Sequence, residues 1–568
     1  MKEAVFLYYK SVVDIPEVPG KITIRKRIYV MYETGRTYNP EKKYNVPNRV
    51  TIGKICENEE GKMYPNEKFN TYFPDTQMPE SDNRPERSSC LRIGTFLVIK
   101  KLMKDSGVKD IVEELFPVDC GLLSDMVAYS IIMENNAAQY YPDYAYNHPL
   151  FTPDYKIYSD TKISSFLKNV TDDQRLGFLD KWNEEREHDK NIYISYDSTN
   201  KNVQAGEIEI AEFGHAKDDP TKPIVNISVG YDHDNREPLF YEEYPGSIVD
   251  VSQLKYMVDK AVGYGYRNVG FVLDRGYFSR GNLNYLDENR MPFVIMAKGN
   301  ANFINGFVKG VQGTFEDDRK KRIGKYKVYG TTIRTNLFPT DDKNRYIHVF
   351  FNDLKAAVER ENLEAKIERM ERNLKKLIGT DKKVREAEKY FWFERDKEGI
   401  IAAIAPQNSE ISKAKKMCGY FVIVTSKRMT AKDALYLYKS RDESEKLFRA
   451  DKSYLGNSAM RVQTDEAFRA KTLIGFIALI IRNRIYTGLD EAIEEGENKP
   501  NYMTVPAAIK ELEKIEMIRQ SDGIYRLDHA VTAAQRNILK AFGIDAKSIP
   551  RKALFISDEL AKVDGIRF

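Results

Sequence analysis

Residues 269–279 read VGFVLDRGYFS, an apolar and β-branched run that ends in an aspartate and passes at once into a turn. Residues 191–199, NIYISYDST, form a second run of the same kind. If the two strands are parallel neighbours, Asp197 and Asp274 lie side by side at the carboxyl edge of an α/β sheet, where open sheets bind their ligands. For either aspartate alone, starting a turn is the better explanation.

Paired carboxylates at one sheet edge predict a cation between them. Two like charges this close repel each other unless a cation intervenes. Hard oxygen ligands suit Mg²⁺ or Mn²⁺. If the two strands are neighbours, the sequence therefore predicts a divalent-metal site.

A helix predicted to begin after Thr430 supplies the third part of the pattern. One phenol, two cations and one carboxylate share a face of this helix: Tyr438, Arg441, Glu445 and Lys452. Their spacing of i, i+3, i+7 and i+14 places them within roughly a 60° arc. Glu443 is rejected as the third acid because it lies about 160° around the helix from Glu445. The spacing also fits a solvated face with an ion pair worth about 0.2–0.5 kcal/mol.

The predicted elements around these motifs give an α/β core with additions at both ends. The expected regions are a β-rich module at 1–75, a Pro-rich linker at 76–90, a helical domain at 91–190, the first part of the α/β core at 191–299, a β-containing insertion at 300–418, the core's last strand and motif helix at 419–455, and an α-rich region at 456–568.

Within the insertion, the run KYKVYGTTIRTNL is expected to stay outside the sheet that carries the aspartates, because residues 300–420 interrupt the regular α/β pattern. A charged helix over about 354–378 has apolar residues at 4-3-4-3 spacing: Leu363, Ile367, Met370, Leu374 and Leu377. This seam is too short for an independent coiled coil, so we expect the helix to pack on a neighbouring segment.

Composition excludes several classes of protein. The 568 residues are 42% apolar and 31% charged, which is typical of globular protein and not of disordered or fibrous chains. The four cysteines and six histidines lack zinc-ligand spacing, and no CxxC is present. The N-terminal run MKEAVFLYYK has no apolar core for a signal peptide, and the most apolar run, 473–481, is too short to cross a bilayer. We expect a cytoplasmic protein without a membrane partner.

Taken together, the two aspartates, the DRGY context of Asp274 and the Y-x2-R-x3-E-x6-K helix resemble the DDE transposases of bacterial insertion sequences. Within them the pattern is most similar to the insertion-sequence-four family, whose hallmark is this Tyr-Arg-Glu-Lys motif. The N-terminal stretch YNPEKKYNVPNRVTIGKI resembles a long-chain subgroup of that family. The resemblance covers most of residues 20–540.

The resemblance implies an RNase H-like core, interrupted by a β-rich insertion, in which Asp197, Asp274 and Glu445 are catalytic and bind two Mg²⁺ or Mn²⁺ ions. Tyr438, Arg441 and Lys452 would contact DNA phosphates beside the scissile bond. The implied reaction is cut-and-paste transposition by cleavage and strand transfer. The implied partners are the inverted-repeat ends of the element, target DNA and a second copy of the chain, in a bacterial cytoplasm beside chromosomal DNA.

Other candidate DNA contacts rest on weaker signals. The densest basic cluster comprises Arg319, Lys320, Lys321, Arg322, Lys325 and Lys327, and a solvated loop beside acidic residues 316–318 explains it equally well. A second basic group near the N-terminus has the same status: Lys21, Arg25, Lys26 and Arg27. By the resemblance, the N-terminal module at 1–75 would bind the ends of the element. By the resemblance Trp392 would stack on a flipped base, although core packing is the more common role of such an aromatic residue. His215 is best explained as a structural residue.

Three other functions fit part of the pattern. A domesticated relative that only binds DNA would be expected to have lost one of the acids. A metal-dependent DNA nuclease without strand transfer shares the same site and is not separated by sequence. A glycosidase would explain paired carboxylates, but not the Tyr, Arg and Lys on the helix face.

Overall fold

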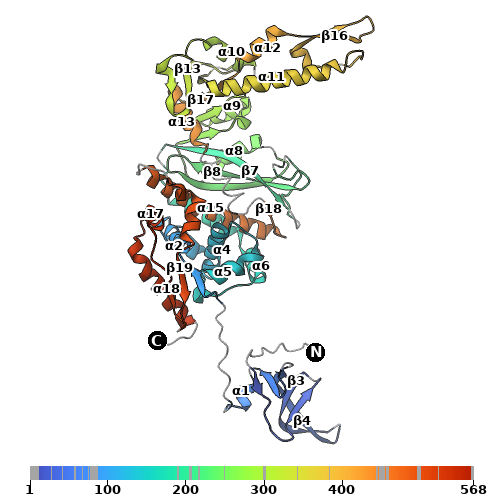
Figure 1. Ribbon diagram of the computed structural model, residues 1–568, viewed down its shortest axis with the longest axis vertical. Coiled ribbons are helices and arrows are strands. Elements are labelled where there is room, and N and C mark those ends of the chain that lie inside the picture. The colour runs from blue at the N-terminus through green and yellow to red at the C-terminus, as the bar shows by residue number, and fades with distance from the viewer. Residues whose placement is uncertain are drawn as a thin grey trace. The chain divides into compact units, whose positions relative to one another are not determined.

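The computed structural model describes residues 12–26, 28–40, 42–56, 59–66, 68–74, 76, 87–188, 191–203, 208–214, 216, 218–248, 250–298, 302–338, 340–341, 343–382, 384–442, 446, 455, 459–494, 500–521 and 523–563. The chain divides after Ser88 into two compact units (Figure 1). This division falls within the Pro-rich stretch expected to be a linker.

The N-terminal unit is a five-stranded antiparallel sheet in the order β1-β5-β4-β3-β2. Its strands are β1 (Val13–Asp14), β2 (Ile22–Arg25), β3 (Tyr29–Asn39), β4 (Tyr44–Ile55) and β5 (Lys62–Pro65), followed by helix α1 (Phe69–Tyr72). Five side chains form its small buried core: Val13, Val30, Ile52, Met63 and Phe69. The alternation of apolar and polar residues in this stretch buries one face of the sheet.

Helices from both ends of the second unit share one hydrophobic core. The first group comprises α2 (Gly94–Asp105), α3 (Val108–Leu115), α4 (Cys120–Met133), α5 (Tyr141–Asn147), α6 (Asp160–Asn169) and α7 (Asp172–Glu184). The second comprises α15 (Asp465–Glu494), α16 (Val505–Leu512), α17 (Ala533–Ala541) and α18 (Ile549–Val563). A small sheet also joins the two groups through β6 (Cys90–Arg92), β19 (Glu516–Arg519) and β20 (Tyr525–Leu527).

The regions expected as separate, 91–190 and 456–568, therefore form one body. Helix α4 is buried along 121–131, so it needs neighbours on all sides, and α15 supplies one of them. Among the described helices, α15 is the one whose length and composition would suffice to cross a membrane, but 78% of its most apolar window is buried inside the protein.

The described residues form a ten-stranded sheet in the order β12-β13-β14-β17-β11-β10-β7-β8-β9, with β18 (Ala459–Met460) added on β7. Its central strands β7 (Ile192–Val203), β10 (Val269–Leu273) and β11 (Phe293–Met296) are parallel. On one side follow the antiparallel strands β8 (Ile224–Asp232) and β9 (Glu237–Pro245). Helices α8 (Asp250–Gly263) and α9 (Arg280–Glu288) link β9 to β10 and β10 to β11.

On the other side, strands from the expected insertion extend this same sheet. After helix α10 (Asn302–Val311), β12 (Arg322–Ile323), β13 (Val328–Asn336) and β14 (Asn344–Phe351) pair in sequence, and β14 pairs with β17 (Tyr420–Thr425). The prediction that KYKVYGTTIRTNL stays outside the sheet is therefore wrong. Ile347, Val349 and Phe350 on β14 are fully buried, because helix α10 and helix α13 (Ala431–Ser440) pack against this strand.

Residues 353–416 form an arm that leaves the sheet between β14 and β17 (Figure 1). It comprises α11 (Asp353–Lys375), the hairpin of β15 (Phe391–Arg395) and β16 (Ile401–Pro406), and α12 (Asn408–Lys416). The apolar seam of α11 packs on Ala387, Tyr390, Phe391 and Ile411 in a core of its own. The expectation that this helix packs on a neighbouring segment is confirmed.

Candidate active site

The two aspartates occupy equivalent positions on neighbouring parallel strands. In the β7–β10 pair Tyr196 stands opposite Leu273, and the next residues are Asp197 and Asp274. Strand β7 continues to Val203, so the expectation that Asp197 ends its strand is wrong; its backbone pairs with β8 on the other side. The side chain of Asp197 lies outside the described part of the structure.

Asp274 follows directly after β10 and caps a single 3-10 turn, 275–277. Its Oδ1 accepts a hydrogen bond of 2.7 Å from the Arg275 backbone N–H. The carboxylate is 38% exposed. Asp274 therefore starts a turn and also presents a carboxylate at the sheet edge, so the two explanations of this residue are compatible.

Helix α13 (Ala431–Ser440) brings Arg441 to Asp274. Its N-terminus is capped by Thr430, whose Oγ accepts from the Asp433 N–H at 3.1 Å. Arg441, the residue that ends the helix, places Nη2 3.8 Å from Asp274 Oδ1. Arg441 is only 8% exposed, so this cation is held close to the carboxylate by the surrounding packing.

Tyr438 is the residue that packs the end of α13 onto the sheet. It is 5% exposed and shares a buried cluster with Val272, Val294 and Leu435. The Arg441 guanidinium carbon lies 5.8 Å from the centroid of its ring. The structure therefore gives Tyr438 a positioning role, while its predicted phosphate contact stays a prediction.

The rest of the predicted helix face is not described. Regular helix α13 ends at Ser440, and Glu443, Glu445 and Lys452 lie outside the described residues, as does His215. Lys446 is described, and its Nζ donates to the Tyr486 hydroxyl of α15 at 3.1 Å.

His233, which the sequence analysis did not select, lies close to Arg441. It follows β8, is 9% exposed, and its ring makes an edge contact with Tyr231 at 5.6 Å. Burial, and secondarily the charge of Arg441, lower the pKa of His233 to about 4. A single histidine in a YDHDN turn carries no periodic signal, so sequence had no means of finding it.

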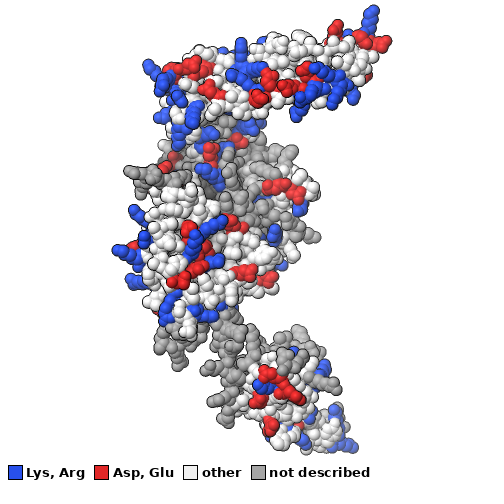
Figure 2. All heavy atoms as spheres, viewed as in Figure 1, with Lys and Arg blue, Asp and Glu red and all other residues white. Residues whose placement is uncertain are grey.

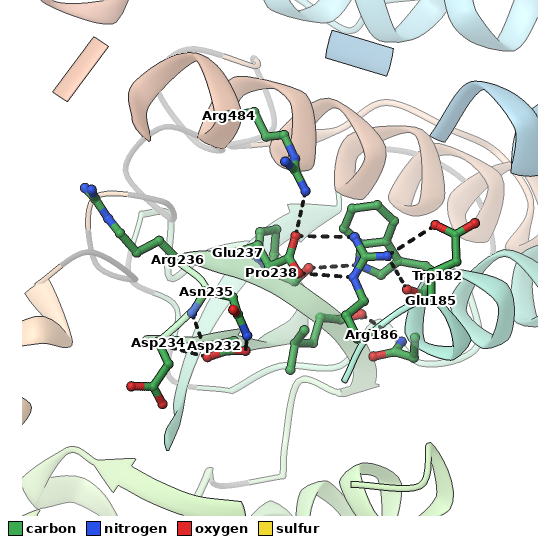
Figure 3. Close-up of polar contacts among 12 residues, drawn as sticks. Trp182, Glu185, Arg186, Asp232, Asp234, Asn235, Arg236, Glu237, Pro238 and Arg484 are labelled. Carbon is green, nitrogen blue, oxygen red and sulfur yellow. Dashed lines mark hydrogen bonds and ion pairs between the residues drawn. The ribbon is translucent and has the colours of Figure 1, made fainter. Parts of the chain in front are cut away.

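The turn that carries His233 is anchored to two helices (Figure 3). Glu237 accepts from Arg186 Nε and Nη2 at 3.1 and 3.3 Å and from Arg484 Nη2 at 2.9 Å. Trp182 Nε1 donates to the Pro238 carbonyl at 3.0 Å. Helices α7 and α15 thus hold the β8–β9 turn in place beside the candidate site.

A groove of about 840 Å³ extends from the neighbour of Asp274 to the arm. Its lining includes Arg275 from the 3-10 turn, Lys439 from α13, Lys355 from α11 and Tyr390 from the arm. Basic side chains from the site and from the arm therefore face one space.

The other predicted DNA-contact residues are exposed. Arg319, Lys320 and Lys321 form a 3-10 turn and Arg322 begins β12, at the far edge of the ten-stranded sheet. Trp392 on β15 is 66% exposed while its neighbour Phe391 is buried. Core packing is therefore the wrong explanation for Trp392, because strand alternation turns it away from the core of the arm.

The residues at the site suit a hard divalent cation as far as they are described. Asp274 offers carboxylate oxygens at a sheet edge, in register with Asp197 on the adjacent strand. Among the side chains that the structure describes, which exclude those of Asp197 and Glu445, no group of three acidic, histidine or cysteine side chains could hold a metal ion.

Comparison with known proteins gives a family. The model of the family described as "Transposase DDE domain" matches residues 194–481, half of the chain, and this range includes Asp197, Asp274 and α13. No curated protein matches the sequence. A cryo-EM structure of a piggyBac transposase synaptic complex with hairpin DNA aligns with 72% of this chain at 10% identity and a TM-score of 0.31, and this chain spans 65% of that transposase. So low a TM-score supports no conclusion, whereas the family match does: this chain belongs to the DDE-domain transposase family.

Proposed function

We propose that this protein is a cut-and-paste transposase of the insertion-sequence-four type, which cleaves the ends of a DNA element and joins them to a target. The observation that carries the proposal is the approach of Arg441 to Asp274, 3.8 Å apart although they are distant in sequence. The Tyr438, Arg441, Glu445 and Lys452 spacing supports the subgroup. The antiparallel β7, β8 and β9 beside the parallel β10 and β11 support an RNase H-like core.

Asp197, Asp274 and Glu445 would hold two divalent ions, Mg²⁺ or Mn²⁺, and transposases of this family generally use such metals. Bound divalent ions would activate the attacking oxygen and stabilise the leaving oxygen of a phosphoryl transfer. The backbone register of β7 and β10 would orient the two aspartates toward one phosphodiester.

Arg441 would act as the fixed cation of the site. Its guanidinium balances the charge of Asp274 and can donate hydrogen bonds to a phosphate oxygen from the same position. Because Arg441 is buried, its attraction to a phosphate is screened less than that of an exposed cation. The groove toward the arm would receive DNA beside the scissile bond, and exposed Trp392 would stack on a flipped base.

Incubation of the full-length protein with labelled duplexes from the DNA that flanks its gene tests this proposal. We expect Mg²⁺-dependent cleavage that leaves 3′-hydroxyl ends, and joining of those ends to a plasmid. EDTA should abolish both reactions. Cleavage without joining would favour the nuclease alternative, and DNA binding without cleavage would favour a domesticated relative.

Assembly is tested on the same protein and duplexes by a second measurement. We expect a homodimer in the complex with element ends and target DNA, measured by light scattering of the DNA-bound protein. A monomer that cleaves and joins both ends would contradict this part of the proposal.

A further inference from the structure

Strands β3 and β4 of the N-terminal unit pair well beyond the rest of their sheet. Strand β2 pairs with β3 only over 29–32, and β5 pairs with β4 only over 53–55. In contrast, β3 and β4 remain paired out to Asn39 and Tyr44. Residues 34–49, called the ribbon from here on, therefore form a two-stranded hairpin that no third strand joins among those the structure describes.

The ribbon is exposed on both faces. None of its described residues is buried, and Tyr38 and Tyr44 are 60% and 56% exposed. A two-stranded hairpin in water is marginally stable at best, so a long one with large exposed aromatic rings suggests a surface that is completed by a partner.

Polar contacts at the base keep the ribbon in one register. Glu33, 7% exposed, accepts from Arg36 Nε at 2.8 Å, and Arg49 lies 3.9 Å from its other oxygen. Asn48 donates to the Thr37 hydroxyl across the strands at 2.8 Å. The ribbon is thus held as a defined shape at its base, while its distal half, 38–45, is paired only as β3 with β4 among the described strands.

The charge of the ribbon favours a polyanionic partner. Residues 34–49 contain Arg36, Lys42, Lys43 and Arg49 against a single acid, Glu41, which gives 4 − 1 = +3. The whole chain has a net charge of only +4. Figure 2 shows Lys and Arg side chains at the surface of the N-terminal unit, at the end where Figure 1 draws this hairpin.

Side chains that can read bases share one face of the ribbon. Tyr38 stands opposite Asn45, and Arg36 stands two residues before Tyr38 on the same strand. Asparagine and arginine are the side chains that pair bidentately with adenine and guanine in the major groove. That groove is about 12 Å wide and accepts a two-stranded β-ribbon.

We propose that the ribbon, residues 34–49, inserts into the major groove of duplex DNA, with Asn45 and Arg36 facing the bases and Lys42 and Lys43 contacting phosphates. This inference rests on the proposed function, because it takes DNA as the substrate and adds the part that recognises its sequence. A protein strand is the less suitable partner: Pro47 has no N–H to offer a strand added to the β4 edge.

The test uses full-length protein, duplexes from the DNA flanking the gene, and scrambled duplexes of equal composition. The double variant Lys42→Ala and Lys43→Ala should make the slope of log K against log salt shallower, by about 0.9 for each lost phosphate contact. The change should be the same on both duplexes. Asn45→Ala should weaken binding by about 5- to 150-fold on the flanking duplex and hardly at all on the scrambled one. Lys54→Ala, an exposed lysine of β4 outside the ribbon, is the matched control and should behave as wild type.

Methylation of guanine N7 in the flanking duplex provides a second readout, because N7 faces the major groove. It should weaken binding of wild type and leave the Arg36→Ala protein less affected, because arginine is the side chain that reads guanine. Wild-type cleavage of the flanking duplex together with unchanged binding by the ribbon variants would overturn this inference and leave the proposed function standing. Ribbon variants that changed the oligomeric state and not DNA binding would also overturn it. Failure of the wild type to bind or cleave any duplex would instead overturn the proposed function.

Discussion

The cations beside Asp274 and the cations of the N-terminal ribbon are presented in opposite ways. Arg441 is 8% exposed and is held 3.8 Å from a carboxylate, whereas Lys42 and Lys43 are exposed on a hairpin without a core. A buried cation is weakly screened and has one position, which suits the alignment of a reacting phosphate. An exposed cation adds affinity by releasing counterions and tolerates small changes in geometry. This difference in burial separates a residue suited to positioning the reacting phosphate from residues suited to binding DNA.

The largest expected effect is that of Asp274→Ala. Removing this carboxylate should abolish cleavage and leave binding of duplex DNA nearly unchanged, because the ribbon and other basic residues supply the affinity. Single-turnover cleavage and gel-shift titration of the same protein measure the two effects. Glu288→Ala, an exposed acid on α9, is the control and should cleave as wild type. Equal loss of binding and cleavage in the Asp274 variant would remove the proposed division between the two regions.

Glu237→Ala should have the next largest effect, on stability. It removes the nearer carboxylate partner of Arg186, whose side chain is 9% exposed and keeps only Glu185 at 3.6 Å, and it also removes the partner of Arg484, so the free energy of unfolding should fall by about 3 kcal/mol. The matched change in the N-terminal unit is Glu33→Ala, whose arginines are 63% and 40% exposed and can return to water. We expect it to cost about 1 kcal/mol or less. Urea unfolding of both variants measures this contrast, and equal losses would contradict it.

Arg441→Ala should reduce the rate of cleavage on the order of 100-fold, because misplacing the phosphate slows the reaction much more than it weakens binding. Binding should change far less: the slope of log K against log salt should change by no more than about 0.9, the value for one phosphate contact. Lys432→Ala, an exposed cation at the start of the same helix, should affect neither. If Arg441→Ala and Lys432→Ala cleave alike, the 3.8 Å approach to Asp274 has no catalytic meaning.

The smallest expected effect concerns acid stability and again differs between the two units. His348 on β14 is buried; the Thr332 hydroxyl lies 2.9 Å from Nδ1, and Nε2 donates at 3.0 Å to the Thr425 hydroxyl, which itself donates to the Lys427 carbonyl. Burial lowers the pKa of His348 to about 4, against about 6.5 in an unfolded chain. Because the unfolded state binds more protons between these two values, the contribution of His348 to the free energy of unfolding should be fully present above pH 6.5. It should be lost as pH falls toward 4.

Replacing His348 by Gln should make unfolding of the second unit less dependent on pH between 6.5 and 4. His233, whose pKa is also lowered to about 4, should keep part of that dependence. Residues 1–88 contain no histidine, so the N-terminal unit should not respond to this change. Thermal unfolding at a series of pH values checks this, and an unchanged pH profile in the His348→Gln protein would contradict it.

Sequence alone located the strands of Asp197 and Asp274, the cap of α13 at Thr430, the seam of α11 and the boundary near Ser88. Each of these depends on local periodicity or on the chemistry of a few neighbouring residues, which are readable without the fold. The family resemblance likewise rests on short spacings along one strand or one helix.

Tertiary structure decided which elements share a sheet and which side chains meet. The pattern of β13 and β14 shows that they are strands, but pairing between strands distant in sequence placed them beside β17 in the sheet of Asp274. In the same way, only the fold joined α4 to α15, buried Arg441 beside Asp274 and brought His233 close to Arg441. The physical reason is that hydrophobic burial is non-directional: a sequence states which residues need covering, and the packing of the whole chain selects what covers them.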